Sequence, residues 1–379
     1  MKKKVIMIAG IFLVVAAAFM IYFIFSDSSI QPIDTVESDA LGSLIGVYDE
    51  KILHMEIDTE GKAVFSLFDR IEETGGGYSL HIATIENPKI VLNEMVLIGN
   101  CLYVNIIMNE QGEPMYTYKI NLMSRAVEPI RKVESYDTFV PIAAYGEEIA
   151  ILECKTLDGV HGESIISTLE DNRELLVRES NREDFSGEYI WDFTAVDDSL
   201  FTIINNWTEN KTFLEQYNSD LEKIQKIDIT ETIDYLEKQN IKDFCVFDRF
   251  AFISNFSRSS ALLSISGDSA FRVVESTYDT PFVRAKSNQS EPIFFIADSP
   301  FVFYLDEEND KIVQSKIKFE EECRIKDMVV GENMTVFVLE DANELYMVDN
   351  KDLFSNRKRE FSVKNKTYVA TTEGLKRQK

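Results

Sequence analysis

The segment IKDFCVFDRFAFI, residues 241–253, decides the fold, because it returns at residues 325–337 as IKDMVVGENMTVF. Each copy contains two short runs of apolar residues separated by turn-forming residues, a pattern that predicts a strand, a tight turn and a second strand. Related segments recur along most of the chain. We therefore predict a radial repeat of small antiparallel sheets, an architecture that hosts many unrelated functions.

The first turn of each repeat sets the period. These turns are expected at residues 49, 99, 146, 197, 247 and 331, so the steps between them are 50, 47, 51, 50 and 84 residues. The last step has room for two units of 42 residues, the first of which matches the pattern less well. Units of about 40–50 residues with four strands each have the length of a propeller blade. The predicted fold is all-β, with four-stranded antiparallel blades that number seven, or alternatively six.

An uncharged, proline-free run of residues follows the three lysines that begin the chain after Met1. It covers Val5–Phe25, and as a helix it would cross a hydrocarbon core of roughly 30 Å. We predict a single transmembrane helix. The alternative, a cleaved secretory signal, requires a shorter apolar run and a small-residue cleavage site. The lysines place the N-terminus in the cytoplasm and the remaining chain outside the cell.

The expected domain order follows from these two features. Residues 1–4 are cytoplasmic, 5–25 span the membrane, 26–40 form an acidic stalk, 41–370 form the repeat domain, and 371–379 form a basic tail. A short helix, begun by a threonine cap, is expected over residues 230–240, between the fourth and fifth repeats. The predicted location is the cell membrane, with the C-terminal domain extracellular.

On this period and strand pattern, residues 41 to about 370 resemble the β-propeller superfamily, in a form similar to the membrane-anchored propellers of bacterial cell surfaces. The repeats carry neither the Trp-Asp nor the Gly-His signature of the WD40 type. The resemblance implies a ring that closes between the first and last blades, with ligands bound on the face where the innermost strands begin. It implies no specific chemistry.

The charge of the chain restricts its partners. The sequence has 65 acidic and 39 basic residues, and all the acids lie after residue 25, where 36 bases remain, so the external part carries 36 − 65 = −29. Such a surface repels nucleic acid and anionic lipid. Solubility is one interpretation, and a preference for a cationic protein or ligand, or for Ca²⁺, is the other.

Four acids occupy equivalent places, each four or five residues before the first turn of its repeat. We expect them to open the innermost strands and to point toward one rim of a central channel, where neighbouring carboxylates would attract a cation. The alternative is that each accepts backbone hydrogen bonds from a neighbouring connection. The four are Glu94, Asp192, Asp243 and Asp327.

Trp207 lies in a polar loop between the second and third strands of its repeat, on the same predicted face. An aromatic side chain in such a loop can anchor a partner. Packing of the indole on its own blade is the alternative.

The sequence singles out no catalytic set. The three histidines, His54, His81 and His161, accompany no nucleophile elbow, and the four cysteines are scattered singly. The acidic run at residues 306–310 lacks the glycine and the final glutamate of an EF-hand. We therefore expect no cofactor, with Ca²⁺ as a possibility, and a non-catalytic binding or scaffolding module. The alternatives are a carbohydrate-active hydrolase or lyase that uses the rim carboxylates, and a component of a membrane signalling or secretion complex.

Overall fold

The computed structural model describes residues 43–48, 51–57, 62–68, 79–85, 88–89, 95–108, 115–133, 140–156, 161–236, 241–255, 259–266, 269–272, 282–284, 286–287, 293–296, 302–306, 311–314, 317–318, 324–331, 333–339, 344–349, 361–362, 367–371 and 374–377. Residues 41–379 form one compact unit, separate from residues 1–40. The predicted anchor at Val5–Phe25 and the stalk at 26–40 lie outside the described residues. Within the described ranges, no helix is long and apolar enough to span a membrane.

The first two sheets are antiparallel meanders in which strands pair in sequence order. The first sheet contains β1 (Ser43–Tyr48), β2 (Lys51–Ile57), β3 (Ala63–Phe68) and β4 (Ser79–Ile85). The second contains β6 (Met95–Ile98), β7 (Cys101–Met108), β8 (Met115–Asn121) and β9 (Val127–Val133), and the short β5 (Pro88–Lys89) also pairs with β7.

The next sheet has eight strands, because two four-stranded units are joined. The first unit contains β10 (Ile142–Tyr145), β11 (Glu148–Thr156), β12 (His161–Thr168) and β13 (Glu174–Asn181). The second contains β14 (Ser186–Val196), β15 (Ser199–Asn206), β16 (Lys211–Tyr217) and β17 (Lys223–Asp228). The junction is the pairing of β13 with β14, which involves only Ser180 with Gly187 and Asn181 with Ser186.

The rest of the chain continues the same pattern after the helix α2 (Thr230–Tyr235). One sheet contains β18 (Ile241–Phe247), β19 (Phe250–Asn255), β20 (Ser260–Ser266) and β21 (Ser269–Arg272), and the next contains β22 (Phe282–Arg284), β24 (Ile293–Ile296), β25 (Val302–Asp306) and β26 (Lys311–Gln314). The last contains β23 (Lys286–Ser287), β28 (Ile325–Val330), β29 (Met334–Leu339), β30 (Glu344–Asp349), β32 (Thr367–Thr371) and β33 (Gly374–Arg377). A separate short pair joins β27 (Ile317–Lys318) to β31 (Phe361–Ser362).

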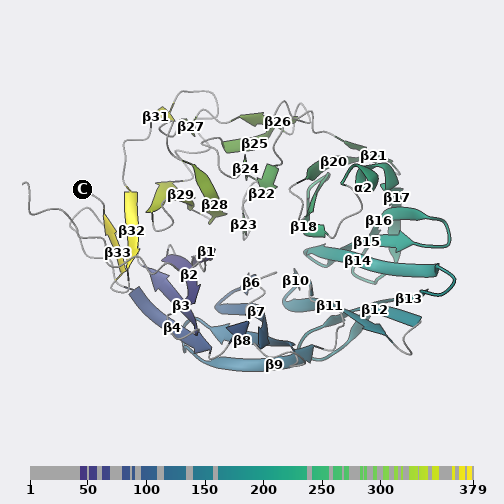
Figure 1. The fold of residues 1–379 in the computed structure, drawn as a ribbon, viewed down its shortest axis with the longest axis horizontal. Helices are drawn as coiled ribbons and strands as arrows, with labels where there is room; N and C mark the ends of the chain where they lie inside the picture. Colours follow the sequence, from purple (N-terminus) through teal and green to yellow (C-terminus); the bar gives the residue numbers. More distant parts are fainter. Residues whose placement is uncertain are drawn as a thin grey trace, which may run out of the picture. The chain divides into compact units, whose positions relative to one another are not determined.

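Successive units lie around one centre, as Figure 1 shows for the compact part of the chain. The first strands β10, β14 and β18 contact one another in sequence order, and β1 contacts β28 of the last sheet. β33 also contacts β4. Among the strands that the structure describes, the first and last sheets meet without exchanging a strand, and the fold is a β-propeller in its topology.

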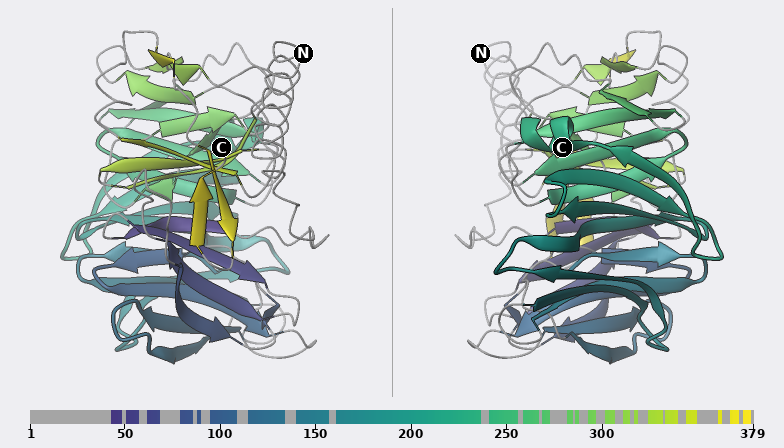
Figure 2. Two further views of the ribbon diagram at one scale, coloured as in Figure 1. Left: turned by 90° about the vertical axis from the view of Figure 1, so that its left-hand side faces the viewer. Right: turned by 90° about the vertical axis from the view of Figure 1, so that its right-hand side faces the viewer.

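The hydrophobic core lies between units, whose sheets are seen from two sides in Figure 2. The second strand of a unit shows how this core forms. Its alternate residues pack against the preceding unit on one face and the following unit on the other. In β15, Leu200 and Ile204 pack against strands of the preceding unit, whereas Phe201 and Ile203 pack against β18 and β19 of the following one. Burial on both faces explains why the second strands are almost continuously apolar.

The repeated Ile-x-Asp sequence forms a β-bulge. In β14, Ile190 pairs with Ile204 and Asp192 pairs with Ile203, so that Trp191 is the extra residue. Such a bulge bends a strand and increases its twist. The equivalent shift occurs between Leu44 and Gly46, between Ile241 and Asp243, and between Ile325 and Asp327.

The first turns predicted at residues 99, 146 and 197 are confirmed, and the one predicted at 49 lies outside the described residues. Gly99, Gly146 and Asp197 begin two-residue turns with φ of 53°, 59° and 52°, a conformation that suits glycine and aspartate in tight hairpins. The turn expected at residue 247 is one residue out of place, because Phe247 still pairs with Phe250 and Asp248 takes the positive φ.

Two further expectations need correction. The helix ends at Tyr235 and has no side-chain cap: the Thr230 hydroxyl bonds Asp228 and the N–H of Thr212 instead. Its buried residues, Ile233 among them, pack against β18 and β19 as the helical spacing predicts. At the C-terminus, β33 lies inside the segment 371–379 that was expected to be a tail.

Candidate partner-binding surface

The acids predicted at the channel rim belong to the bulges. The side chain of Asp192 has no exposed surface, and its Oδ1 accepts a hydrogen bond of 2.7 Å from the N–H of Phe193. Asp327 accepts an equivalent bond of 2.8 Å from Met328. Because each of these carboxylates bonds the next residue of its own strand, the geometry supports a local structural role for both.

Of the remaining two acids, the structure describes only Asp243. Asp243 occupies the same bulge position in β18 and is partly exposed, whereas Glu94 lies outside the described residues. Where the structure describes the chain, no three His, Cys, Asp or Glu side chains gather closely enough to hold a metal ion. Asp192, Asp243 and Asp327 are therefore not brought together as a calcium site.

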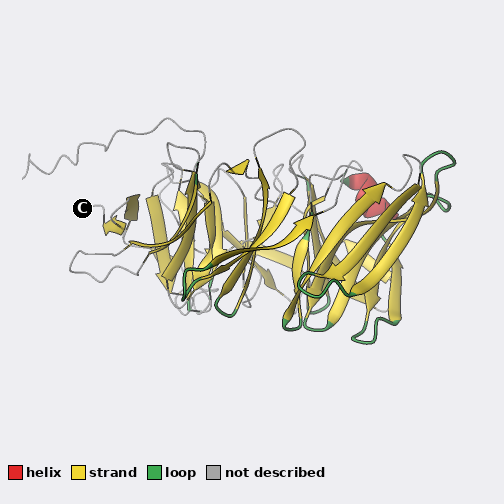
Figure 3. Cartoon of the chain, turned by 90° about the horizontal axis from the view of Figure 1, so that it is seen from below, coloured by secondary structure: helices red, strands yellow, loops and turns green. Residues whose placement is uncertain are grey.

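Trp207 lies at the end of the sheets where the first strands begin. Because neighbouring strands are antiparallel, the turn between β15 and β16 shares this end with the connections between units. One of those connections, residues 182–185, joins β13 to β14. Helix α2, another connection between units, is seen at one end of the strands in Figure 3.

Three aromatic rings gather here. The Trp207 ring lies 6.2 Å from Phe185 in a tilted arrangement and 6.3 Å from Tyr189 in a stacked one, measured between centroids. Phe185 is 70% exposed, and its φ is 52°. We call these residues the aromatic cluster. A bulky residue at positive φ is uncommon, and a large exposed ring adds nothing to the core, so stability does not explain Phe185.

Hydrogen bonds between the two turns hold the aromatic cluster in place. The N–H of Trp207 donates to the carbonyl of Gly187 at 3.0 Å, and the N–H of Gly187 donates to the hydroxyl of Thr208 at 2.9 Å. Gly187 has a φ of 87°, and a Cβ there would lie 2.4 Å from the carbonyl oxygen of Glu179. Only glycine therefore fits at this crossing of the chain.

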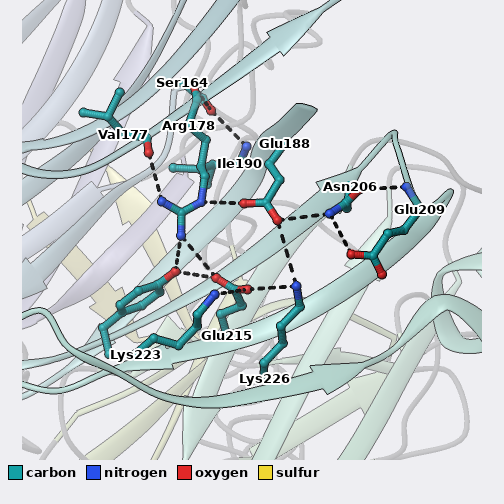
Figure 4. Close-up of polar contacts among 11 residues, drawn as sticks. Ser164, Val177, Arg178, Glu188, Ile190, Asn206, Glu209, Glu215, Lys223 and Lys226 are labelled. Carbon is teal, nitrogen blue, oxygen red and sulfur yellow. Dashed lines mark hydrogen bonds and ion pairs between the residues drawn. The ribbon is translucent and has the colours of Figure 1, made fainter. Parts of the chain in front are cut away.

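Acidic side chains border the aromatic cluster. Asn206 Nδ2 donates to Glu188 Oε1 at 3.1 Å and to Glu209 Oε1 at 3.2 Å, contacts that Figure 4 shows. The Asn206 Oδ1 accepts a bond of 2.8 Å from the N–H of Glu209. Glu183 and Asp184, in the other turn, are exposed. The two turns thus present carboxylates beside exposed aromatic surface.

A buried ionic network lies beneath this surface and joins two units. Arg178 of β13 pairs with Glu188 at 2.9 Å and with Glu215 of β16 at 3.4 Å. Glu215 is completely buried, and Lys223 Nζ lies 2.9 Å from its Oε1. Burial raises the pKa of Glu215, but its hydrogen bonds from Tyr217 and Lys223 outweigh that effect, so its pKa lies below the ordinary value. Glu215 is therefore ionised at neutral pH.

The sequence indicated one member of the aromatic cluster and missed two. Trp207 is recognisable as an aromatic residue in a polar loop, but Phe185 lies in the connection between β13 and β14, and Tyr189 lies in β14. Their proximity depends on the short pairing of β13 with β14 and on Gly187. The one available signal is the pair of aromatic residues that flank Ser186-Gly187-Glu188 in a turn-forming stretch.

No protein-family model and no curated protein matches the sequence. Among solved structures, the chain is similar to the β-propeller domain of the Trilobed protease from Pyrococcus furiosus, with 14% identity and a TM-score of 0.47, over 83% of this chain and 99% of that chain. It is also similar to Pyrococcus horikoshii acylaminoacyl peptidase, with 10% identity and a TM-score of 0.48, over 82% of this chain and 51% of that chain. The chain spans about half the length of that peptidase. These comparisons show no family for the chain.

Proposed function

We propose that this chain is a single-pass membrane protein whose seven-bladed β-propeller acts outside the cell as a non-catalytic binding module. Val5–Phe25 supplies the anchor, and the aromatic cluster supplies the partner surface. The observation that carries the proposal is Phe185, which is 70% exposed at a φ of 52°. Residues held in sparsely populated backbone regions cluster at functional sites.

A partner is the simplest reason to keep such a residue. In the neighbouring four-residue turns, the equivalent last position is Asn172 with φ of 58° and Asn210 with φ of 52°. Asparagine adopts this conformation at little cost, so it would serve the turn equally well. Phe185 instead adds exposed aromatic surface next to Trp207, and aromatic residues dominate the energetics of protein interfaces.

Site-specific photo-cross-linking in the full-length chain tests the proposal. A photoreactive phenylalanine analogue at position 185 should give a discrete adduct in the native membrane, and the adduct should disappear with Trp207→Ala. The matched control is position 123, where Met123 is also 70% exposed but lies in the turn between β8 and β9, at the other end of the sheets. Equal adducts at 185 and 123, or adducts at 185 that survive Trp207→Ala, would contradict a specific partner surface.

The anchor and the orientation have their own test. A membrane-impermeant thiol reagent should label a cysteine placed at Met123 in intact cells, and the chain should stay with the membrane in alkaline carbonate. Release of the chain by carbonate, or labelling only after lysis, would contradict the proposed topology. Replacement of Val5–Phe25 by an unrelated transmembrane helix should preserve the adduct at position 185, whereas a chain that assembles through its own helix would lose it.

A further inference from the structure

Resting on the proposed function, we propose that the aromatic cluster binds a positively charged peptide segment, with a lysine or arginine side chain over the Phe185 and Trp207 rings. The negative face of an aromatic ring attracts a cation, and tryptophan does so most strongly. The ligand class follows from the charges around the rings.

The carboxylates beside the cluster outnumber the available cations. Glu183, Asp184 and Glu209 are exposed. Arg182 is the basic residue of these two turns, at residues 182–185 and 207–210, against the three acids. Among the cations of the adjoining strands, Arg178 pairs with Glu188 and Glu215, and Lys211 pairs with Asp228 at 2.8 Å. The field above the rings is therefore negative, in keeping with a chain whose formal net charge is −26.

The protein uses the same combination inside its own fold. Lys226 Nζ lies 3.9 Å from the centroid of the Phe213 ring and 3.6 Å from the carboxylate of Glu215. Lys119 Nζ lies 5.5 Å from the Tyr103 ring and 2.7 Å from Glu170. In each case a ring and a carboxylate hold one ammonium group. The aromatic cluster offers rings and carboxylates, and no cation that the structure describes lies over Phe185 or Trp207.

The rigidity of the cluster favours binding. The two turns are fixed to each other through Trp207, Gly187 and Thr208 before any partner arrives. A preformed surface loses little conformational entropy when it binds. An extended basic peptide can then place one cation over the rings and further cations near the exposed acids.

Tryptophan fluorescence supplies a direct readout. The sequence contains two tryptophans, Trp191 and Trp207. The full chain carrying Trp191→Phe therefore reports on Trp207 alone. The probe is a glycine-lysine peptide with four lysines, titrated at fixed ionic strength, and its fully acetylated form is the neutral control. We expect the lysine peptide, and not the acetylated one, to change the Trp207 emission in a saturable manner.

Matched substitutions separate a specific site from general attraction to an acidic protein. Phe185→Asn keeps the backbone conformation used by Asn172 and Asn210, so it should weaken peptide binding at least fivefold without lowering the melting temperature. Glu183→Gln should weaken binding about two- to threefold, whereas Glu147→Gln, the same change in an exposed turn at the other end of the sheets, should leave it unchanged. Equal effects of Glu183→Gln and Glu147→Gln, or unchanged binding by Phe185→Asn, would overturn the proposal.

A sugar ligand gives a different outcome. If an N-acetylglucosamine oligomer changes the Trp207 emission and the lysine peptide does not, the cluster is a carbohydrate platform and the inferred ligand class is wrong. The proposed function would survive that result as long as the cross-link at position 185 still depends on Trp207. If neither the cross-link nor any fluorescence response is observed, the aromatic cluster is not a binding surface, and the proposed function fails together with the inferred ligand class.

Discussion

Gly331, the residue after β28 in the last sheet, lies directly against Val47 of β1 in the first sheet. A Cβ placed on Gly331 would be 2.6 Å from the Cβ and 2.8 Å from the Cγ1 of Val47. The N–H of Gly331 also donates to the carbonyl of Met334 at 2.8 Å, which fixes the turn. This contact is where the beginning and the end of the repeat meet, and it leaves no room for a side chain.

Gly331→Ala should therefore destabilise the closed ring. A methyl group inserted into this contact must displace Val47 or separate the two sheets, at a cost of about 1–3 kcal/mol in the free energy of unfolding. Chemical denaturation measures the change. Val47→Gly in the same chain should recover part of the loss, because it removes the atoms that the new methyl group meets. Strictly additive effects of the two substitutions would show that the first and last sheets do not meet here.

Glu215→Gln should be strongly destabilising, because it leaves Arg178, Lys223 and Lys226 without their common buried counter-ion. A hydrogen bond to a charged group contributes about 1.5–3 kcal/mol, and Arg178 keeps its pair with Glu188 in the variant. The matched control is Glu148→Gln, which breaks the exposed pair between Glu148 and Arg173, whose side chains are 45% and 50% exposed. That change should cost less than about 1 kcal/mol. Similar unfolding midpoints for the two variants would contradict the role assigned to Glu215.

The repeat can be predicted from the sequence because its pattern of strands and turns is local. Strands and tight turns are encoded within about ten residues, and the burial of both faces of β11, β15 and β19 shows as almost continuous apolar runs. The bulge was not predictable in the same way. The pattern places Ile, any residue and Asp at equivalent positions, but a register shift becomes visible only when the partner strand is known.

The candidate site was only partly predictable for a related reason. Trp207 is conspicuous within its own loop, whereas its contact with Phe185 joins residues more than twenty positions apart across two units. The position of Phe185 depends on the pairing of Asn181 with Ser186 and on the φ of Gly187. Both are properties of the folded chain. Of the four acids predicted at equivalent positions, Asp192, Asp243 and Asp327 occupy the bulges, and Glu94 lies outside the described residues.

Substitutions of Asp192 separate the bulge role from a role at the channel rim. Asp192→Asn keeps an oxygen that can accept the N–H of Phe193, so it should cost less than Asp192→Ala, which leaves that N–H without its acceptor at about 1–3 kcal/mol. Thermal unfolding measures the difference. If Asp192 instead attracted cations at the channel rim, both substitutions would remove its charge and that attraction would be lost in both variants. If both variants fold like the parent and both lose the cross-link at position 185, the charge rather than the hydrogen bond is what matters.

His54 should make stability depend on pH. It lies in β2, where burial lowers its pKa from 6.5 to about 4. In the unfolded chain the imidazole binds a proton below about pH 6.5, while the folded protein resists protonation until about pH 4. The contribution of a neutral His54 is therefore complete above pH 6.5 and is lost as the pH falls toward 4. At pH 5 the loss should reach about 2 kcal/mol relative to pH 7.

His54→Gln tests this dependence, because the variant keeps a polar side chain that does not titrate. Acidic groups also titrate in this range, so the informative quantity is the difference between parent and variant in the free energy of unfolding at pH 7 and pH 5. The parent should lose more stability than the variant over that interval, and the two should run parallel above pH 7. A proton NMR titration of the His54 C2 resonance gives the same pKa independently. A midpoint near 6.5 would mean that water reaches the ring in the folded protein, and the predicted difference in stability would then vanish.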